Sequence, residues 1–522
     1  MSSITATPPV QLAQPSGVEM NAYLILEKKP IRQDIKLKTL SKYVQQYPTG
    51  WKKRLELAEL LYAMGRWEQA VKEYRQVIER QPQFIDVRLQ LGKILQSLGR
   101  EAEAIEVYES ARDLISNVAI AHHINGLIEA CRRRLQQATQ LFERAASMEP
   151  ENIFHWLALG LTHLEAEAPV EALRAFDAVL ELNPTDIVAL SHSYEALMMV
   201  GDFQEAQQRL RQVLEVFPHD LRSLKQLADH RSRMGLVWGE EGKQTKQMIQ
   251  TAQRIAPGAA YAYDSLAQYH IFRGEWKQGV AVLQQFVEQR PLNPSGWYYY
   301  AWCLFYTGNS TAAAEAILKA YALYPKDWEI YRALCEILPE AGRLERLQPV
   351  VEEMLERFPE RWSVWATAGQ VLVECFQDKE WGCTVSAKGT QLQPRLADAW
   401  FRHGQVLALA GRHWEAVIAL EQGWRRLPQQ GGYLQAVPAA VSLGESYRVL
   451  GEEAKSRRWW GEAFERAKEL MDFNRAIAHY WQGRALEGLG DVTGACCAYR
   501  IALSRQLLYP ARGEVKEALK QL

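Results

Sequence analysis

Apolar and small residues recur along this chain every three to four positions. Two representative segments carry them as Trp156, Leu159, Gly160 and His163, and as Trp400, His403, Gly404 and Leu407. This period of about 3.6 residues predicts amphipathic helices that turn one stripe toward a core. A glycine follows most such segments at a fixed distance, where it supplies the left-handed conformation that ends a helix.

A longer period joins these helices in pairs. A small residue recurs every 34 positions, as Ala70, Ala104, Ala138, Ala172 and Ala206. Four positions later comes a large apolar residue, as Tyr74, Tyr108, Phe142, Phe176 and Leu210. A proline follows most of these alanines and stops the second helix. The series of prolines begins at Pro82 and continues in the later units as far as Pro428. Neither helix of a pair can bury its apolar stripe alone, so successive pairs must stack into a solenoid.

The repeated unit resembles the tetratricopeptide repeat (TPR), with the pattern W-x-x-L-G-x-x-Y, then A-x-x-x-F, then P. The resemblance covers roughly residues 18–510 and implies an all-α, right-handed superhelical solenoid of about 13 helix-turn-helix units. The units begin at Trp51, Ile85, Ala119, Ile153, Ile187, Leu221, Ala260, Pro294, Trp328, Trp362, Ala397, Val437 and Ala476.

Departures from the period divide the chain into segments. We expect a disordered tail at 1–17, a degenerate first helical pair at 18–50 and TPR units 1–5 at 51–220. An irregular unit with an insertion follows at 221–259, units 7–11 at 260–430, an insertion with units 12–13 at 431–509, and a capping helix at 510–522. A terminal cap is expected because the last repeat otherwise exposes its apolar face.

Charge and cysteine content narrow the range of partners and of cellular settings. The formal net charge is −1 at pH 7, which gives no field that would attract nucleic acid or an anionic membrane. Seven cysteines form no C-x-x-C pair, as is typical of reduced thiols in the cytoplasm. No run of 18 apolar residues occurs, so we expect no membrane insertion.

The resemblance also implies where a partner binds. In TPR proteins the first helices line a concave groove that holds a peptide or helix of a partner, and unit positions 2, 5, 9, 12 and 13 face it. Six aromatic residues fall at these positions, and we expect them to form the main contact. They are Tyr261, Phe272, Tyr298, Trp302, Phe305 and Tyr306. The sequence leaves open a second reading, in which these rings pack between adjacent repeats.

A second strip of groove positions is aliphatic and rich in methionine. It includes Phe154, Leu161, Leu164, Met198 and Met199. Apolar surfaces with adaptable methionines suit an amphipathic helix laid into a groove. The alternative is that the inner face of a tight superhelix packs partly on itself.

Motifs for catalysis are not found in the sequence. Phosphate-binding glycine loops and the G-x-S-x-G elbow are missing, and His122 and His123 point about 100° apart on a helix. We therefore expect no catalytic residues, no metal and no cofactor. The predicted function is a protein-interaction scaffold or adaptor. The alternatives are an accessory or regulatory subunit of an enzyme encoded elsewhere and a catalyst built on the solenoid, and self-association is left open.

Overall fold

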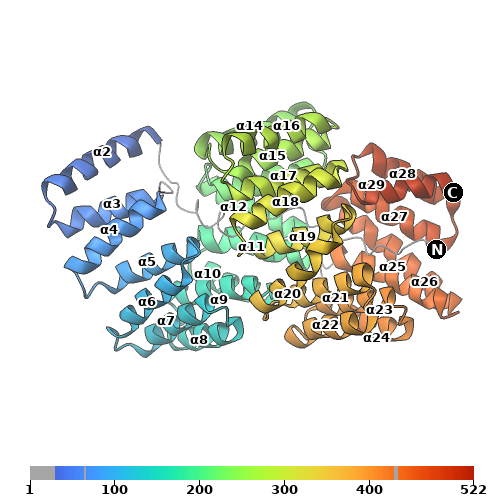
Figure 1. Cartoon of the computed structure of the whole chain (residues 1–522), viewed down its shortest axis with the longest axis horizontal. Helices are drawn as coiled ribbons and strands as arrows, with labels where there is room; N and C mark the ends of the chain where they lie inside the picture. Colours follow the sequence, from blue (N-terminus) through green and yellow to red (C-terminus); the bar gives the residue numbers. More distant parts are fainter. Residues whose placement is uncertain (1–29, 64–65, 428–432) are drawn as a thin grey trace.

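The computed structural model of the protein describes residues 30–63, 66–427 and 433–522. Within these ranges the regular structure is helical, without strands, and each helix packs against its neighbours in the chain (Figure 1). The fold class predicted from the 34-residue period, an all-α solenoid of helical pairs, is confirmed. The tail expected at 1–17 and most of the first half of the pair expected at 18–50 lie outside the described residues.

The helices alternate along the chain as first and second members of a pair. The N-terminal half contains α2 Pro30–Gln46, α3 Trp51–Ala63, α4 Trp67–Arg80, α5 Ile85–Ser97, α6 Glu101–Arg112, α7 Val118–Cys131, α8 Leu135–Met148, α9 Ile153–Glu165, α10 Pro169–Leu182, α11 Ile187–Val200, α12 Phe203–Val216, α13 Leu221–Arg233 and α14 Gly239–Ile255. The C-terminal half contains α15 Ala260–Phe272, α16 Trp276–Gln289, α17 Pro294–Thr307, α18 Ser310–Leu323, α19 Trp328–Glu340, α20 Leu347–Arg357, α21 Trp362–Phe376, α22 Lys379–Leu392, α23 Ala397–Leu409, α24 His413–Trp424, α25 Tyr433–Val449, α26 Glu453–Glu469, α27 Arg475–Leu489, α28 Val492–Ser504 and α29 Ala511–Gln521. The odd-numbered helices from α3 to α27 are the first helices of their pairs.

One contact holds the two helices of a pair together. Gly160 on α9 leaves its Cα bare, and the ring of Phe176 on α10 lies against it, so that a Cβ at Gly160 would come within 2.6 Å of that ring. Gly92 and Tyr108 repeat this arrangement in an earlier pair, where the distance would be 2.3 Å. Both rings are fully buried. The glycine therefore sets how closely the helices approach, and the ring fills the space between them.

The turn between the two helices of a pair needs a left-handed residue. Gly201 and Gly308 meet this need after α11 and α17, with φ of 82° and 93°. Glu167 stands at the same point after α9 with φ of 54°, a conformation that costs a residue with a Cβ of the order of 1 kcal/mol.

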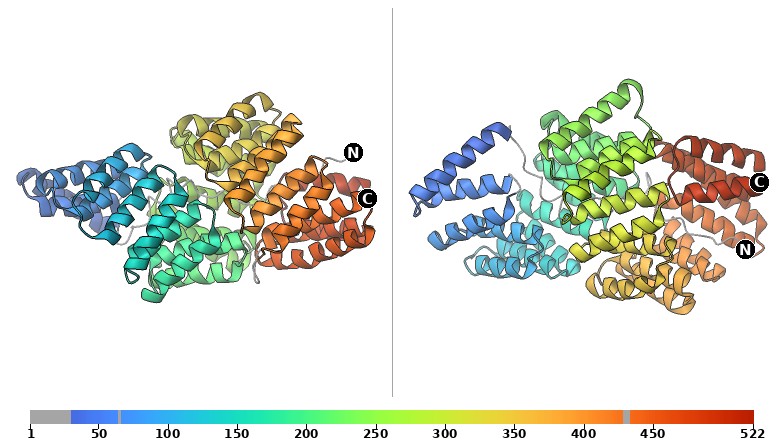
Figure 2. Two further views of the ribbon diagram at one scale, coloured as in Figure 1. Left: turned by 90° about the horizontal axis from the view of Figure 1, so that it is seen from below. Right: turned by 45° about the horizontal axis from the view of Figure 1, so that its top comes forward.

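The solenoid winds back onto itself, so segments about 200 residues apart touch (Figures 1 and 2). Arg361 Nη1 and Ser363 Oγ both donate to Glu167 Oε1 at 2.8 Å. Gln393 Nε2 donates to the carbonyl of Ala166 at 3.1 Å. These contacts join the α9–α10 turn to the segment around α21 and α22.

A second set of contacts joins the C-terminal helices to the middle of the chain. The rings of Phe203 and Phe473 stack with centroids 4.8 Å apart. Arg512 Nη2 donates to the carbonyl of Thr307 at 2.8 Å. The last helix, α29, thus packs against its own repeat and also reaches the end of α17. Together the two sets of contacts turn the concave groove into a partly enclosed space.

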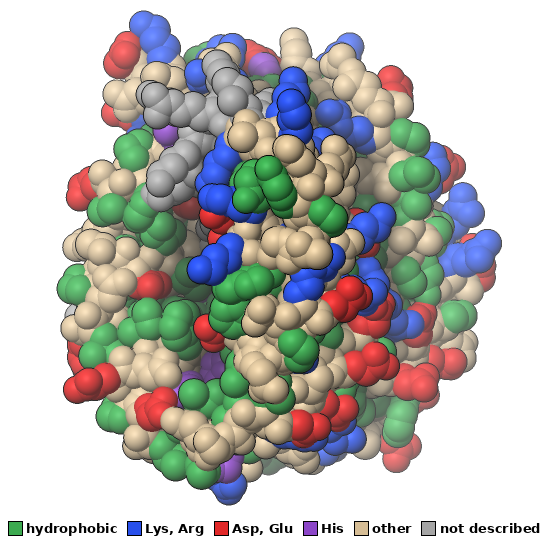
Figure 3. All heavy atoms as spheres, turned by 90° about the vertical axis from the view of Figure 1, so that its left-hand side faces the viewer, with side chains coloured by type: hydrophobic (Ala, Val, Ile, Leu, Met, Phe, Trp, Pro, Cys, Tyr) green, Lys and Arg blue, Asp and Glu red, His purple; other side chains and the backbone are tan. Residues whose placement is uncertain are grey.

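The outer surface is mixed in character. On the face shown in Figure 3, basic, acidic and apolar side chains are interspersed. Among the described helices none combines the length and the apolar character needed to cross a bilayer.

The glycine and ring contact gives a first prediction. Replacing the buried Phe176 by alanine should lower the free energy of unfolding by about 3–5 kcal/mol, since it leaves a cavity against Gly160. The matched control is Phe154→Ala on the adjacent helix α9, where the ring is 66% exposed and the expected change is about 0.5 kcal/mol or less. Guanidinium unfolding followed by circular dichroism measures both. An equal loss for the two variants would contradict this account of the pair.

Candidate partner-binding cavity

The enclosed space is a cavity of about 810 Å³ on the inner side of the superhelix. The first helices α11, α13, α15, α17, α19, α21, α23, α25 and α27 all contribute to its wall, and α29 closes one side. The resemblance predicted that first helices line the concave surface. The two helices of each pair run side by side, so the first helix of each pair faces the inside of the superhelix and the second faces the outside.

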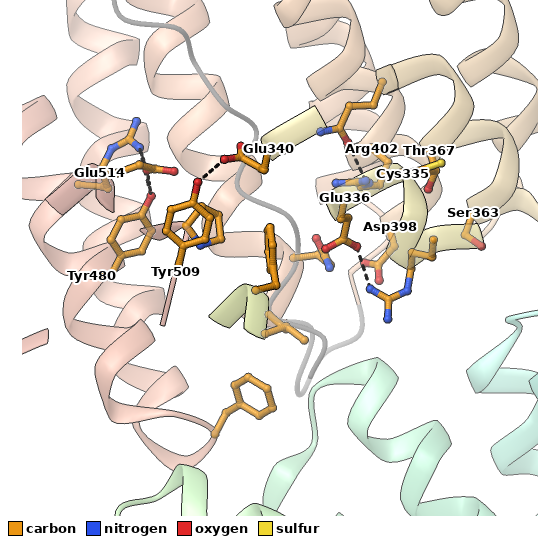
Figure 4. A pocket seen from close by; sticks show the side chains of 18 of the residues that line it. Cys335, Glu336, Glu340, Ser363, Thr367, Asp398, Arg402, Tyr480, Tyr509 and Glu514 are labelled. Carbon is orange, nitrogen blue, oxygen red and sulfur yellow. Dashed lines mark hydrogen bonds and ion pairs between the residues drawn. The ribbon is translucent and has the colours of Figure 1, made fainter. Parts of the chain in front are cut away.

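The C-terminal side of the cavity is built by tyrosines and carboxylates (Figure 4). Tyr480 Oη donates to Glu514 on α29 at 2.6 Å. Arg484 Nη2 lies 3.0 Å from Glu445, and its Nη1 lies 3.5 Å from Glu514. Tyr509, just before α29, donates to Glu340 at the end of α19. These bonds connect four elements across the cavity.

The opposite side carries arginines among acids, with Glu336, Asp398 and Arg402 turned toward the interior (Figure 4). Arg332 Nη1 donates to Glu336 at 2.8 Å, and its Nη2 donates to Glu329 at 2.7 Å. Burial raises the pKa of Glu336 in spite of this arginine. Burial also lowers the pKa of the Arg402 guanidinium.

Asp398 is the most perturbed carboxyl group on this side. Burial raises its pKa to about 7, the charge of Glu167 raises it further, and Arg402 acts in the opposite direction. Asp398 therefore exchanges its proton near neutral pH.

A buried polar ledge lies on α13 and α15. Lys225 Nζ and Asp229 Oδ2 pair at 2.7 Å, and both side chains are only 5% exposed. Gln268 Nε2 donates to Asp264 Oδ2 at 2.6 Å. Burial, and then the charge of Asp229, raise the pKa of Asp264 to about 8. Lys225, Asp229 and Gln268 line the cavity, whereas Asp264 lies behind them.

The six aromatic residues expected to form an exposed strip are placed differently. Tyr261, Phe272, Tyr298, Trp302 and Phe305 are buried, and Tyr306 is half-buried. Trp302 stacks on Tyr306 with centroids 5.2 Å apart and carries the Arg332 guanidinium over its ring. These rings therefore expose little surface and pack on one another and on neighbouring helices, while their assignment as partner contacts stays a prediction.

The physical reason is the close approach of successive first helices. Helix α17 contacts both α15 and α19, so these aromatic side chains lie against neighbouring helices, whereas Arg332 and Glu336 at the same unit positions of α19 reach the cavity. Of the six rings, Phe305 lines the cavity, where it meets Tyr509 edge-on at 5.3 Å.

The aliphatic strip is divided by the structure. Met198 and Met199 are half-buried and line the cavity. Leu161 and Leu164 pack partly buried against the core beside Phe176, and Phe154 is exposed outside the cavity. The structure thus brings two of these five residues to the site.

The charged residues of the cavity wall are not among those predicted from the sequence, although they lie at the unit positions that face the groove in TPR proteins. Positions 5 and 9 are Lys225 and Asp229 in one unit, and Arg332 and Glu336 in another. A search for charge at these positions in successive units would have found the wall. The selection favoured aromatic residues instead.

Within the described residues, no group of three or more His, Cys, Asp or Glu side chains is arranged to hold a metal ion. His123 Nδ1 and His155 Nδ1 lie 3.0 Å apart, which joins two neighbouring repeats. Burial lowers the pKa of His123 to about 3, so that ring is neutral under ordinary conditions.

A solenoid of stacked helical pairs with an inward-facing cavity belongs to the class of helical repeat proteins. Tetratricopeptide-repeat family models match residues 55–118, 130–187 and 265–327, and a second such model matches 163–230. These ranges of the chain are tetratricopeptide repeats.

Similarity to individual proteins is low. The chain is 23% identical over 321 residues to the protein CTR9 homolog of Arabidopsis thaliana, which covers 60% of this chain and 26% of that relative. This chain therefore spans about a quarter of the relative's length. Among solved structures, yeast Tom70 matches at 14% identity with a TM-score of 0.40, over 80% of this chain and 96% of Tom70. The MamA protein matches at 22% identity with a TM-score of 0.23, over 32% and 90%.

The raised pKa of Asp398 gives a second prediction. Its folded pKa of about 7 exceeds the unfolded value of about 3.9, so the folded state keeps this proton longer and stability falls as pH rises from 4 to 7. Asp398→Asn removes this loss. We compare the free energy of unfolding of the variant with that of the wild type. The difference, variant minus wild type, should increase by about 1 kcal/mol or more between pH 4.5 and pH 8.

Guanidinium unfolding at the two pH values measures this gain. The exposed Glu356→Gln serves as the control and should show almost no such growth. A difference between Asp398→Asn and the wild type that does not depend on pH would refute the assignment.

Proposed function

We propose that this chain is a protein-interaction scaffold that binds a peptide or helix of a partner protein in the cavity of its concave surface. The observation that supports the proposal most strongly is the wall itself. Nine successive first helices present charged, amide and aromatic side chains to one continuous space. A cavity lined by a few orienting polar groups among apolar side chains is the usual form of a binding site.

The lining also combines properties that favour protein segments as occupants. Met198 and Met199 offer adaptable apolar contact, and Trp362 and Phe305 add aromatic surface. Charged side chains stand between them, and such groups fix the register of a bound segment more than they add affinity. A cytoplasmic setting is part of the proposal, and the seven cysteines, all without disulfide partners, are consistent with it.

Obstructing the cavity tests the function. Thr367 on α21 is half-buried and lines the cavity, whereas Thr384 on α22 of the same pair is exposed and lies outside it. Thr367→Trp should therefore weaken partner binding about tenfold or more, because the indole occupies space the segment needs. Thr384→Trp adds the same indole to the outer surface and should leave binding unchanged.

Tagged wild type and both variants, purified from the organism that encodes the chain, are compared by quantitative mass spectrometry. Circular dichroism first establishes that both variants keep their helical content. Partners that are lost from Thr367→Trp alone support the cavity as the binding site. Equal recovery from all three proteins would reject it.

A further inference from the structure

The cavity wall is more strongly negative than the chain as a whole. Eleven of its lining residues are Asp or Glu and six are Lys or Arg, an excess of five acids, in a chain whose formal net charge is −1. The ion partners just behind the wall lower this formal excess by about one charge. Arg222 beside Glu195 and Arg361 beside Glu167 are cations and Glu329 beside Arg332 is an anion, whereas Asp264, with its pKa raised to about 8, is mostly uncharged at pH 7. Asp398 of the wall, with its pKa raised to about 7, carries only about half a charge at that pH, so the wall stays negative by about three charges.

Three of the six cations of the wall are held in ion pairs. Arg332 pairs with Glu329 and Glu336, Arg484 with Glu445, and Lys225 with Asp229. The other three make neutral contacts: Arg402 donates to the Gln370 amide oxygen, and Arg233 and Arg448 lie over the rings of Phe473 and Trp460. In contrast, Glu340 and Glu487 are exposed and accept hydrogen bonds from the hydroxyl groups of Tyr509 and Tyr499. A neutral hydroxyl leaves the charge of a carboxylate uncompensated. The excess negative charge is therefore open to an occupant of the cavity.

The polar ledge adds a second and independent observation. Gln226 Oε1, Asp229 Oδ1 and Gln268 Oε1 are buried oxygens for which the described part of the chain provides no hydrogen-bond donor. The three residues are 6%, 4% and 7% exposed, and all three line the cavity. A buried acceptor without a donor costs about 1–3 kcal/mol. An occupant with N–H groups would recover this loss.

We propose that the segment bound in this cavity is basic, with Lys or Arg side chains facing Glu340, Glu487 and Glu517, and with N–H groups donating to the oxygens of Gln226, Asp229 and Gln268. This inference rests on the proposed function and specifies the chemistry of the partner. Of these carboxylates, Glu517 also pairs with the exposed Lys520 at 2.7 Å, and a surface pair of this kind contributes so little stability that a cation of the segment can replace Lys520.

Arginine and lysine carry only donors, so they match the uncompensated carboxylates of the wall and these three acceptor oxygens. Three donors of the lining, Arg233 Nε, Trp362 Nε1 and Trp460 Nε1, are also buried without an acceptor among the described residues and would be met by backbone carbonyl oxygens of the segment. Charges in a partly enclosed space are also screened less by salt than charges on an open surface.

The chain's own N-terminal residues are a poorer match for this wall. Residues 1–29 contain Glu19, Glu27, Lys28 and Lys29, so their side chains bring no net positive charge. A partner protein is therefore the occupant that the charges favour.

The test uses the full chain and three fluorescein-labelled octapeptides. One alternates arginine with alanine, the second replaces each arginine by glutamine, and the third replaces each arginine by glutamate. Fluorescence anisotropy measures binding at several salt concentrations. We expect the arginine peptide to bind at least tenfold more tightly than the other two, and its affinity to fall as salt rises.

Two triple variants with the same change in net charge test whether the arginine peptide binds in the cavity. The triple substitution Glu340→Gln, Glu487→Gln and Glu517→Gln neutralises exposed acids of the wall, and should weaken the arginine peptide about tenfold. The control triple is Glu345→Gln, Glu356→Gln and Glu380→Gln, which neutralises three exposed acids outside the cavity and should change affinity less than twofold. Both triples alter net charge equally, and circular dichroism establishes that they fold.

Each outcome bears on one of the two proposals. Equal weakening by the two triples, or binding of the glutamate peptide as tight as that of the arginine peptide, would overturn the basic occupant. If the glutamine peptide binds best and Thr367→Trp blocks it, the scaffold function holds and its partner is not basic. If no octapeptide binds, the basic occupant fails. The scaffold function is then decided by the mass-spectrometry comparison, in which partners lost from Thr367→Trp alone support it.

Discussion

The contact of Glu167 with Arg361 and Ser363 is the constraint on which the binding cavity depends. It joins the turn after α9 to the start of α21, almost 200 residues further along the chain. Glu167 occupies a left-handed position that a glycine would hold without strain, and its carboxylate would be lost with a glycine. The strain of the left-handed conformation at Glu167 is therefore offset by the hydrogen bonds that its carboxylate accepts from Arg361 and Ser363. This contact acts together with the stacked rings of Phe203 and Phe473 and with the bond from Arg512 to Thr307, which close the first helices around the cavity from the other side.

Closure also determines the electrostatics of the wall. Carboxylates that would be hydrated in an open groove are desolvated, and this is the first cause of the raised pKa of Glu336, Asp398 and Glu445. Arg332 is held between two acids for the same reason, since a buried cation without a partner would be unstable. Shape and charge of the site therefore have one origin, the curvature that brings distant repeats together.

Local pairing could be predicted from the sequence, and long-range closure could not. The contact between Gly160 and Phe176 repeats with the unit, so a single chain reveals it many times, and α9 and α19 begin at Ile153 and Trp328 as the period predicts. Closure depends instead on small rotations summed over several repeats, which no motif records. The same summed curvature buried Trp302, which was expected to be exposed, and left the charged positions on α13 and α19 as the wall.

The contacts that close the superhelix differ in strength from the contacts inside a helical pair. The turns are joined by a few polar bonds and by the stacked rings of Phe203 and Phe473. Each polar bond contributes about 1 kcal/mol, whereas a buried ring such as Phe176 contributes about 3–5 kcal/mol to its pair. Any one of these contacts is thus weaker than the core of a repeat, and closure rests on several of them together, among them the edge-on rings of Phe305 and Tyr509. Under the proposed function, a segment that enters the cavity would part some of these contacts while every helical pair stays intact, so its affinity would be coupled to closure.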